Sequence, residues 1–422
     1  MKYAVYTLGC KVNQYETQAI ETMLRERGFE PTDTGADVII VNTCAVTAES
    51  GRKSRQAIRR LQNSHPGALT AVCGCFSQLE PEQMKDLGAD IVFGSGDKHK
   101  LVEAIVKAVP GVEVDDPFRR RYFEPLPAGA VSGRTRAMLK IQDGCDNFCT
   151  YCVIPYTRGR VRSLPLEDCA AQAAQLAREG FGEIVVTGIE IASYGKDLPG
   201  KPSLADAVEA IAKAAPGVRI HLGSLEPTVV TDGFCTRLAA LGNVCPHFHL
   251  SLQSGCDDTL ARMKRKYDTG TFLQVCERLR RHFPGCSLTA DLICGFPGES
   301  EEDFQATLAF LERCGFFYVH AFPYSVRPGT KAADMPDQLS RQEKERRVRR
   351  AGEVIKMVQH TYLESCVGRI LPVLFENDWE GHGDNYCVVR VETPTKRGSV
   401  RNVIITGVDG EILLGEFTNL SV

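Results

Sequence analysis

Hydrophobic and polar positions follow two alternating periods along the first part of the chain. Short runs of consecutive apolar residues, typical of buried strands, precede stretches in which apolar residues recur every three or four positions, typical of amphipathic helices. This order predicts a small α/β domain with a mostly parallel sheet over residues 1–115. The expected strands are residues 2–8, 37–42, 69–75 and 91–93, and the expected helices are residues 14–27, 50–62, 81–87 and 98–108.

A segment rich in proline, glycine and arginine, residues 116–135, interrupts this pattern and is predicted to be a linker. Strand and helix then alternate again over residues 136–362. Six such units predict an open, partial (β/α)6 barrel, in which ligands bind at the C-terminal ends of the strands. The expected strands are residues 137–142, 183–187, 218–222, 247–252, 288–293 and 317–322; the expected helices are residues 166–179, 204–214, 228–241, 271–282, 301–314 and 340–364.

The pattern changes once more over residues 363–422, where short alternating strands are separated by turns. Asp409-Gly410 is a strong signal for a hairpin turn. The sequence therefore predicts a small all-β barrel at this end of the chain. Its expected strands are residues 370–375, 386–391, 402–408 and 411–417.

Length and charge narrow the class of protein. A chain of 422 residues is too long for one ordinary hydrophobic core, which agrees with several domains. The net charge of −3 neither requires nor excludes a nucleic-acid partner. No apolar run approaches the roughly 18 residues of a membrane helix, and the N-terminus lacks the pattern of a secretory signal. We therefore expect a cytoplasmic protein without a membrane partner.

The chain has 17 cysteines, which we expect to be reduced thiols, some of them metal ligands. Three of them, Cys145, Cys149 and Cys152, form a compact loop directly after a predicted strand. Three thiolates suit an iron–sulfur cluster with one open iron, which is the arrangement of a catalytic site. A structural zinc loop is the alternative, although zinc sites usually present two cysteine pairs.

The loop Cys145-Asp-Asn-Phe-Cys149-Thr-Tyr-Cys152 resembles that of the radical SAM enzymes. The resemblance implies a [4Fe–4S] cluster that binds S-adenosylmethionine (SAM) and cleaves it into methionine and a 5′-deoxyadenosyl radical. It also implies SAM contacts at later strand ends, each of which has a plain alternative as a turn residue. These are Glu190 for the SAM ammonium, Ser251 and Gln253 for the ribose, and Gly295 where the backbone approaches the adenine.

A second group of cysteines follows the first three predicted strands. Cys10, Cys44 and Cys75 each come directly at or after a strand end. Neighbouring parallel strands end at the same edge of a sheet, so these thiols can converge on a second metal site with an open iron. Three small core residues are the alternative interpretation, and the nearby Cys73 makes the choice of Cys75 ambiguous.

Longer segments resemble the methylthiotransferase family over essentially the whole chain: TLGCKVNQYET, NTCAVT, GCFSQ, CDNFCTYCVIPYTRGRVRS, SLQSGCDDTLARMKRKY and LICGFPGE. The resemblance implies an N-terminal cluster domain, a radical SAM barrel and a C-terminal TRAM domain. It makes Cys10, Cys44 and Cys75 the ligands of a second [4Fe–4S] cluster and implies no catalytic residue beyond the cluster ligands. One SAM would methylate a sulfur at that cluster, and a second would give the radical that activates the substrate carbon.

The N-terminal segment TLGCKVNQYET most resembles the subgroup that acts on C2 of threonylcarbamoyladenosine beside the anticodon of tRNA. The subgroups acting on isopentenyladenosine or on a ribosomal protein carry different residues after the first cysteine. The resemblance implies the tRNA anticodon loop as partner and a reductant such as flavodoxin or ferredoxin. Arg158, Arg160 and Arg327 are candidates to bind the threonyl carboxylate, with a structural or surface role as the alternative.

A non-enzymatic iron–sulfur protein, which binds RNA or carries electrons, is the interpretation from a different class. Sites with three cysteines argue against it, because electron carriers usually complete four ligands. Several basic runs along the chain favour a phosphate-binding surface. The C-terminal segment has more acidic than basic residues, so we expect RNA contacts mainly on the barrel and the first domain.

Overall fold

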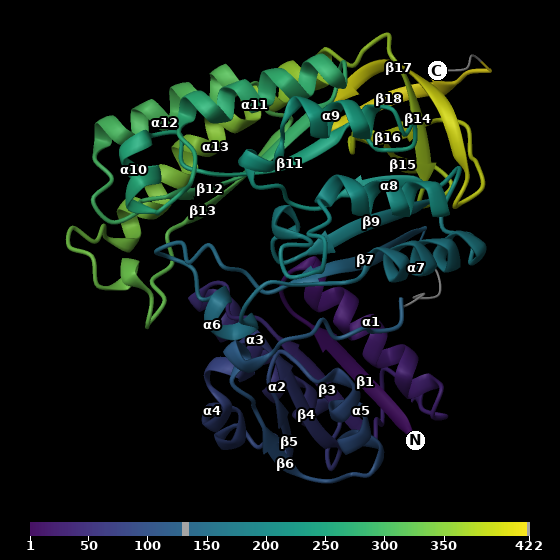
Figure 1. Ribbon diagram of the computed structural model, residues 1–422, viewed down its shortest axis with the longest axis vertical. Coiled ribbons are helices and arrows are strands. Elements are labelled where there is room, and N and C mark those ends of the chain that lie inside the picture. The colour runs from purple at the N-terminus through teal and green to yellow at the C-terminus, as the bar shows by residue number, and fades with distance from the viewer. Residues whose placement is uncertain (129–134, 420–422) are drawn as a thin grey trace.

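The structure is a computed structural model that describes residues 1–128 and 135–419. Three sheet systems follow one another along the chain and also in space (Figure 1). The N-terminal sheet lies at the bottom of the view, the central strands lie above it, and a closed β-barrel lies at the upper right. This order confirms the predicted fold class.

The N-terminal domain, β1 to β6 with α1 to α5, is a six-stranded parallel sheet covered by helices. Its central strands are runs of valine and isoleucine that are buried on both faces, as parallel sheets require. The sheet has the order β2-β1-β3-β4-β5-β6. The strands are β1 (Lys2–Thr7), β2 (Glu30–Pro31), β3 (Val38–Thr43), β4 (Leu69–Gly74), β5 (Ile91–Phe93) and β6 (Gly111–Glu113); the helices are α1 (Lys11–Arg25), α2 (Ala48–Ser64), α3 (Cys75–Leu79), α4 (Pro81–Asp86) and α5 (Lys98–Val106).

The central domain is an open barrel of six parallel strands in two sheets, β10-β9-β7 and β11-β12-β13. Between β10 and β11 the described residues form only isolated bridges, so the barrel is partial. The strands are β7 (Arg136–Asp143), β9 (Glu183–Gly188), β10 (Arg219–Leu222), β11 (His247–Gln253), β12 (Ser287–Cys294) and β13 (Tyr318–Pro323), with β8 (Arg162–Ser163) antiparallel to β7. The helices are α6 (Ile154–Arg158), α7 (Leu166–Arg178), α8 (Leu204–Ala214), α9 (Asp232–Ala239), α10 (Asp257–Arg262), α11 (Thr269–His282), α12 (Glu301–Cys314) and α13 (Arg341–Glu364).

Helix α1 of the N-terminal domain packs against the barrel strands β7 and β9, as Figure 1 also shows. The contact is polar as well as apolar, because Lys140 of β7 donates to Glu16 of α1 at 3.0 Å. The C-terminal ends of the N-terminal strands therefore point towards the barrel.

The C-terminal domain is a closed five-stranded barrel in the order β14-β15-β16-β18-β17. The turn at Asp409-Gly410 joins β17 and β18 as predicted, with Gly410 at φ 60°. Arg219 of β10 donates to the carbonyls of Pro372 (3.0 Å) and His382 (3.1 Å), which fixes this domain to the central barrel. The strands are β14 (Ile370–Phe375), β15 (Glu380–Gly383), β16 (Val388–Val391), β17 (Val400–Asp409) and β18 (Ile412–Phe417). None of the helices within residues 1–128 and 135–419 has the length and hydropathy of a membrane-spanning helix.

Candidate iron–sulfur and substrate site

The barrel trio, Cys145, Cys149 and Cys152, lies in the loop that leaves the C-terminal end of β7. All three thiols are partly exposed. Burial raises the pKa of Cys145 and of Cys152, and the neighbouring Cys149 raises both further, so the three thiols lie close together. The Arg265 guanidinium donates to the Cys149 Sγ at 3.1 Å, and the Asn147 backbone N–H lies 3.5 Å from the Cys145 Sγ. A cavity of about 200 Å³ borders this loop. Three converging thiols with N–H donors to sulfur fit an iron–sulfur cluster.

Glu190 follows β9 and is hydrogen-bonded to Asn147, which lies within the cysteine loop. The Asn147 side chain donates to the Glu190 carboxylate at 3.0 Å, and the Glu190 backbone N–H donates to Gln142 at 2.7 Å. Burial, and next the charge of Glu226, raise the pKa of Glu190 to about 7. Both carboxylates line a cavity of about 240 Å³, so this position favours a bound cation such as an ammonium group.

Ser251 and Gln253 lie at the end of β11, and Arg265 links this strand end to the barrel trio. The guanidinium that donates to Cys149 also lies 3.4 Å from the Ser251 carbonyl. Ser251 Oγ is 3.0 Å from the hydroxyl of Ser224. Gln253 sits in the left-handed region at φ 67°, where the pairing with β12 changes register. Arg265 therefore joins the Ser251 end of β11 to the cysteine loop, and SAM contacts of Ser251 and Gln253 stay predictions.

Gly295 follows β12 and has a structural reason to be glycine. Its φ is 74°, and a Cβ atom there would lie 2.6 Å from the Lys344 side chain of α13. The Gly295 backbone N–H donates to the Glu299 carboxylate at 2.7 Å. Helix packing and a turn thus account for this glycine without a ligand, and a SAM contact of its backbone stays a prediction.

The N-terminal trio, Cys10, Cys44 and Cys75, lies where β1, β3 and β4 end. Burial raises the pKa of the Cys10 and Cys44 thiols, and the nearby Cys75 raises both further. The three thiols are therefore close to one another. Gly9 explains the close approach of two of these loops: at φ 99°, a Cβ atom would lie 2.8 Å from the Cys44 Sγ. The topology therefore brings the predicted second set of thiols together at one sheet edge.

Cys73 does not belong to this edge. Its side chain is fully buried in the apolar core that contains Tyr15 and Ile20. Cys75 is instead the first residue of α3, not the last residue of a strand as the sequence predicted, because β4 ends at Gly74. This turn directs Cys75 towards the barrel and favours it over Cys73 as a ligand.

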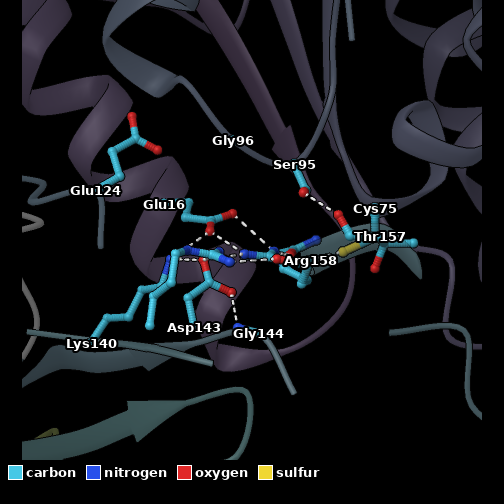
Figure 2. A network of polar contacts seen from close by, with 12 residues as sticks. Glu16, Cys75, Ser95, Gly96, Glu124, Lys140, Asp143, Gly144, Thr157 and Arg158 are labelled. Atoms are coloured by element: carbon cyan, nitrogen blue, oxygen red, sulfur yellow. Dashed lines mark hydrogen bonds and ion pairs between the residues drawn. The ribbon is translucent and has the colours of Figure 1, made fainter. Parts of the chain in front are cut away.

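Arg158 corrects the sequence-based expectation that it binds substrate. Its side chain is fully buried, and Figure 2 shows it between the N-terminal domain and the barrel. The guanidinium donates to Cys75 Sγ at 3.2 Å, to Asn13 at 2.8 Å and to both carboxylate oxygens of Glu16. It also lies 3.4 Å from Asp143. A guanidinium with these partners has no donor left for a substrate.

The other two arginines considered for the threonyl carboxylate lie in different surroundings. Arg160 is half exposed, pairs with Asp146 at 3.0 Å and lies over the rings of Phe118 and Phe148. Arg327 is 9% exposed, and its Nε has no hydrogen-bond partner among the described residues. Burial lowers the pKa of Arg327, and the charge of Cys44 offsets part of this shift. The Arg327 guanidinium therefore lies near the N-terminal trio.

The two trios lie at the same interface, because α3, which begins at Cys75, packs against α6, which begins two residues after Cys152. Sequence reasoning missed Arg265, although it stands in the segment SLQSGCDDTLARMKRKY that carried the resemblance. It also missed Lys11, whose pKa is lowered by burial and by Arg136 of β7. The signal for Lys11 was its place directly after Cys10.

Comparisons with known proteins agree with this geometry. Residues 139–311 match the family model described as the radical SAM superfamily, and residues 2–94 match the one described as uncharacterized protein family UPF0004. Among solved structures, the radical SAM methyltransferase TsrM from Kitasatospora setae, with cobalamin and a [4Fe–4S] cluster bound, is similar with a TM-score of 0.57. The identity is 16%, over 79% of this chain and 77% of that one, so the likeness concerns the fold.

Two curated relatives are similar over almost their whole length. The threonylcarbamoyladenosine tRNA methylthiotransferase MtaB of Bacillus subtilis is 38% identical, over 92% of this chain and 89% of the relative. The tRNA-2-methylthio-N(6)-dimethylallyladenosine synthase of Syntrophomonas wolfei is 34% identical, over 100% of this chain and 95% of the relative. The sequence match extends through the segments that carry both cysteine trios. The chain therefore belongs to the tRNA methylthiotransferase family of radical SAM enzymes.

Proposed function

We propose that the protein transfers a methylthio group to C2 of N6-threonylcarbamoyladenosine beside the anticodon of tRNA, using SAM and two [4Fe–4S] clusters. The observation that carries this proposal is the placement of two cysteine trios, from different domains, at one shared interface. The 38% identity to MtaB, whose name gives this substrate, supports the choice of nucleoside.

In this proposal the barrel trio holds one cluster and the N-terminal trio holds the other. When bound, the first supplies the electron that cleaves SAM, and the second supplies the sulfur. Glu190 receives the SAM ammonium, Ser251 and Gln253 contact the ribose, and the backbone of Gly295 contacts the adenine. The interior between the domains keeps water away from a reactive radical.

Arg265 and Arg158 support the two trios in the same way. Arg265 donates an N–H to the Cys149 Sγ at 3.1 Å, and Arg158 donates one to the Cys75 Sγ at 3.2 Å. A hydrogen bond of this kind fixes the direction of the Sγ atom and so orients it as a ligand. Neither arginine needs to touch SAM or RNA for this role.

The partner in this proposal is the tRNA anticodon loop, because an unpaired base can leave the stack and enter a protein interior at low cost. The electron reaches the barrel cluster from a reductant such as flavodoxin or ferredoxin. Both partners place the reaction in the cytoplasm.

The decisive experiment offers the reconstituted protein two tRNAs, one with threonylcarbamoyladenosine and one with isopentenyladenosine beside the anticodon. We expect a methylthio group only on the first, measured by nucleoside mass spectrometry. Modification of only the second tRNA would transfer the assignment to the other subgroup, to which this chain is 34% identical. Failure to form 5′-deoxyadenosine from SAM under reducing conditions would instead favour the non-enzymatic interpretation.

A further inference from the structure

A cavity of about 510 Å³ lies where the three domains meet. Residues from α1, from the barrel strands β7, β9 and β10, and from the C-terminal domain line it, so no single domain forms it. Its volume lies within the range of roughly 300–1,000 Å³ that is typical of small-molecule sites. The lining residues used below are Lys11, Arg136, His221, Glu376 and Arg397.

The cavity carries an excess of positive charge. Lys11, Arg136 and Arg397 contribute cations, and Glu376 is its one lining carboxylate among the described residues. Glu376 is already paired, since it accepts from Arg136 and lies 3.3 Å from His382. An anionic or carboxylate-bearing ligand would therefore meet a favourable potential here.

Lys11 and Arg397 are the cations that remain available in this cavity among the described residues, and Lys11 is the one from the domain that carries the N-terminal trio. Its side chain is surrounded by the three domains but opens onto the water-accessible cavity, and within residues 1–128 and 135–419 it makes neither a hydrogen bond nor an ion pair. Arg136, by contrast, is held by Glu376 at 2.9 Å and lies 4.0 Å from Glu183. An ammonium with three free donors can bind a carboxylate without breaking an existing contact.

The Lys11 ammonium faces the interior of the barrel. Burial lowers the pKa of three barrel histidines, and the charge of Lys11 lowers it further in each of them. They are His221 of β10, His247 of β11 and His320 of β13. Lys11 also directly follows Cys10, so its charge lies at the place where the N-terminal trio meets the barrel.

The chemistry of the substrate requires a cation near that trio. The threonylcarbamoyl group is attached to N6, which only N1 and C6 separate from C2 on the adenine ring. When C2 approaches the sulfur at the N-terminal trio, the free carboxylate of the threonyl group must therefore lie close by. An isopentenyl group at the same N6 is uncharged and apolar.

Resting on the proposed function, we propose that Lys11 binds the threonyl carboxylate and so determines specificity for threonylcarbamoyladenosine over uncharged N6 substituents. Arg397, an exposed lining residue from the C-terminal domain, adds to the positive potential of the cavity. Lys11 thus takes the place of Arg158, whose donors are all used within the protein, as the residue proposed to bind the threonyl carboxylate. Arg327 near Cys44 is the competing candidate.

The test uses three anticodon stem-loop RNAs that carry threonylcarbamoyladenosine, its carboxyl methyl ester, or isopentenyladenosine at the same position. The ester keeps the shape and removes the charge. We expect wild type to bind the acid about 10- to 100-fold more tightly than the ester, the ratio for one charge-assisted hydrogen bond. We expect Lys11→Met to bind both with equal Kd and Lys11→Arg to keep the preference. The same ratios should appear in kcat/KM for methylthiolation.

Lys107→Met is the matched control, because this exposed lysine of the N-terminal domain pairs only with Glu103 of its own helix among the described residues. It should keep the wild-type ratio. Iron content and 5′-deoxyadenosine formation show whether each variant retains its clusters, and if Lys11→Met loses iron, Lys11→Gln takes its place. An unchanged ratio in the Lys11 variants, or its loss in Arg327→Gln instead, overturns the assignment. No methylthio product from wild type on any RNA refutes the proposed function separately.

Discussion

Arg158 holds two domains together through a single buried side chain. Its guanidinium lies between Glu16 of α1 and Asp143 of β7, and Lys140 completes the network with bonds of 3.0 and 2.7 Å to the same two carboxylates (Figure 2). Burial alone would raise the pKa of Glu16, but the charges of Arg158 and Lys140 lower it to about 2. All four charged groups are therefore ionised at neutral pH and depend on one another.

Replacing Arg158 with methionine should destabilise the protein strongly. The change leaves Glu16 and Asp143 with two buried cations, Lys140 and Arg162, in place of three. Breaking such a network typically costs about 3–5 kcal/mol. The measurement is the free energy of unfolding of the N-terminal domain from urea titrations. Arg119→Met is the control, because Arg119 is 88% exposed and its bridge to Asp116 should be worth less than about 1 kcal/mol. Equal effects of the two variants would contradict the structural importance of the network.

The cysteine ligand candidates were predictable as residues, whereas their supporting arginines were not. Spacing in the chain places Cys145, Cys149 and Cys152 in one loop, and strand ends place the other trio at one edge. Arg158 and Arg265 act on sulfurs 83 and 116 positions away. No local pattern records such contacts, since the first depends on how two domains dock and the second on how distant segments of the barrel come together.

At the scale of elements, periodicity predicted every long strand and helix but missed several of the short ones, although it found β5 and α4. β2 and β6 have two and three residues, too few to show a period, and both lie exposed at the edges of the sheet. The expected helix over residues 228–241 is divided into a 3-10 turn at Pro227–Val229 and α9, because Thr231 caps α9 by accepting from the Phe234 N–H at 3.1 Å. Short elements such as α3 are fixed by tertiary contacts, and α3 is the one that carries Cys75.

Aromatic side chains from β10, β11 and the C-terminal domain pack together where these elements meet. The ring of Tyr386 stacks on His247 at 4.8 Å and meets the edge of His221, also at 4.8 Å. The His221 Nε2 and the His247 Nδ1 lie 2.5 Å apart, so at least one ring must stay neutral. Burial, and next the charge of His221, lower the pKa of His247 well below its usual 6.5.

This packing predicts a loss of stability in mild acid. An unfolded histidine takes up a proton near pH 6.5, whereas folded His247 resists protonation, so the unfolded state binds more protons as pH falls below 6.5. Its contribution is complete above pH 6.5 and declines below it by at most about 1.4 kcal/mol per pH unit. Thermal unfolding between pH 7.5 and 5.5 should show a shallower pH dependence for His247→Gln than for wild type. His360→Gln, at an exposed site on α13, should keep the wild-type slope.

At the scale of the whole molecule, the reaction site belongs to no single domain. The N-terminal sheet presents one cysteine trio, the partial barrel presents the other, and α1 lies against β7 and β9 between them. The C-terminal barrel closes the cavity beside Lys11 through residues such as Glu376 and Arg397. The sequence predicted the three units and their order, but the shared cavity depends on their docking.

This division between domains predicts that the two cluster sites can be emptied independently. Reconstituted wild type should bind roughly eight irons per chain, from two four-iron clusters. Replacing Cys145, Cys149 and Cys152 with alanine should remove about half, and replacing Cys10, Cys44 and Cys75 should remove the other half. Because the barrel trio and the residues around Glu190 stay intact in the N-terminal variant, it should still convert SAM into 5′-deoxyadenosine, yet form no methylthio product. The barrel variant should do neither.

Cys73→Ala is the matched control for the N-terminal variant, since Cys73 stands two positions from Cys75 and is buried in the apolar core instead. It should retain full iron content and near-normal methylthiolation, with only the modest loss of stability that a small core truncation brings. Iron analysis and product mass spectrometry measure both quantities on the same samples. If the N-terminal triple variant kept all its iron, or still formed methylthio product, the second cluster would have to lie elsewhere. Loss of half the iron from Cys73→Ala alone would move the third ligand from the start of α3 to the end of β4.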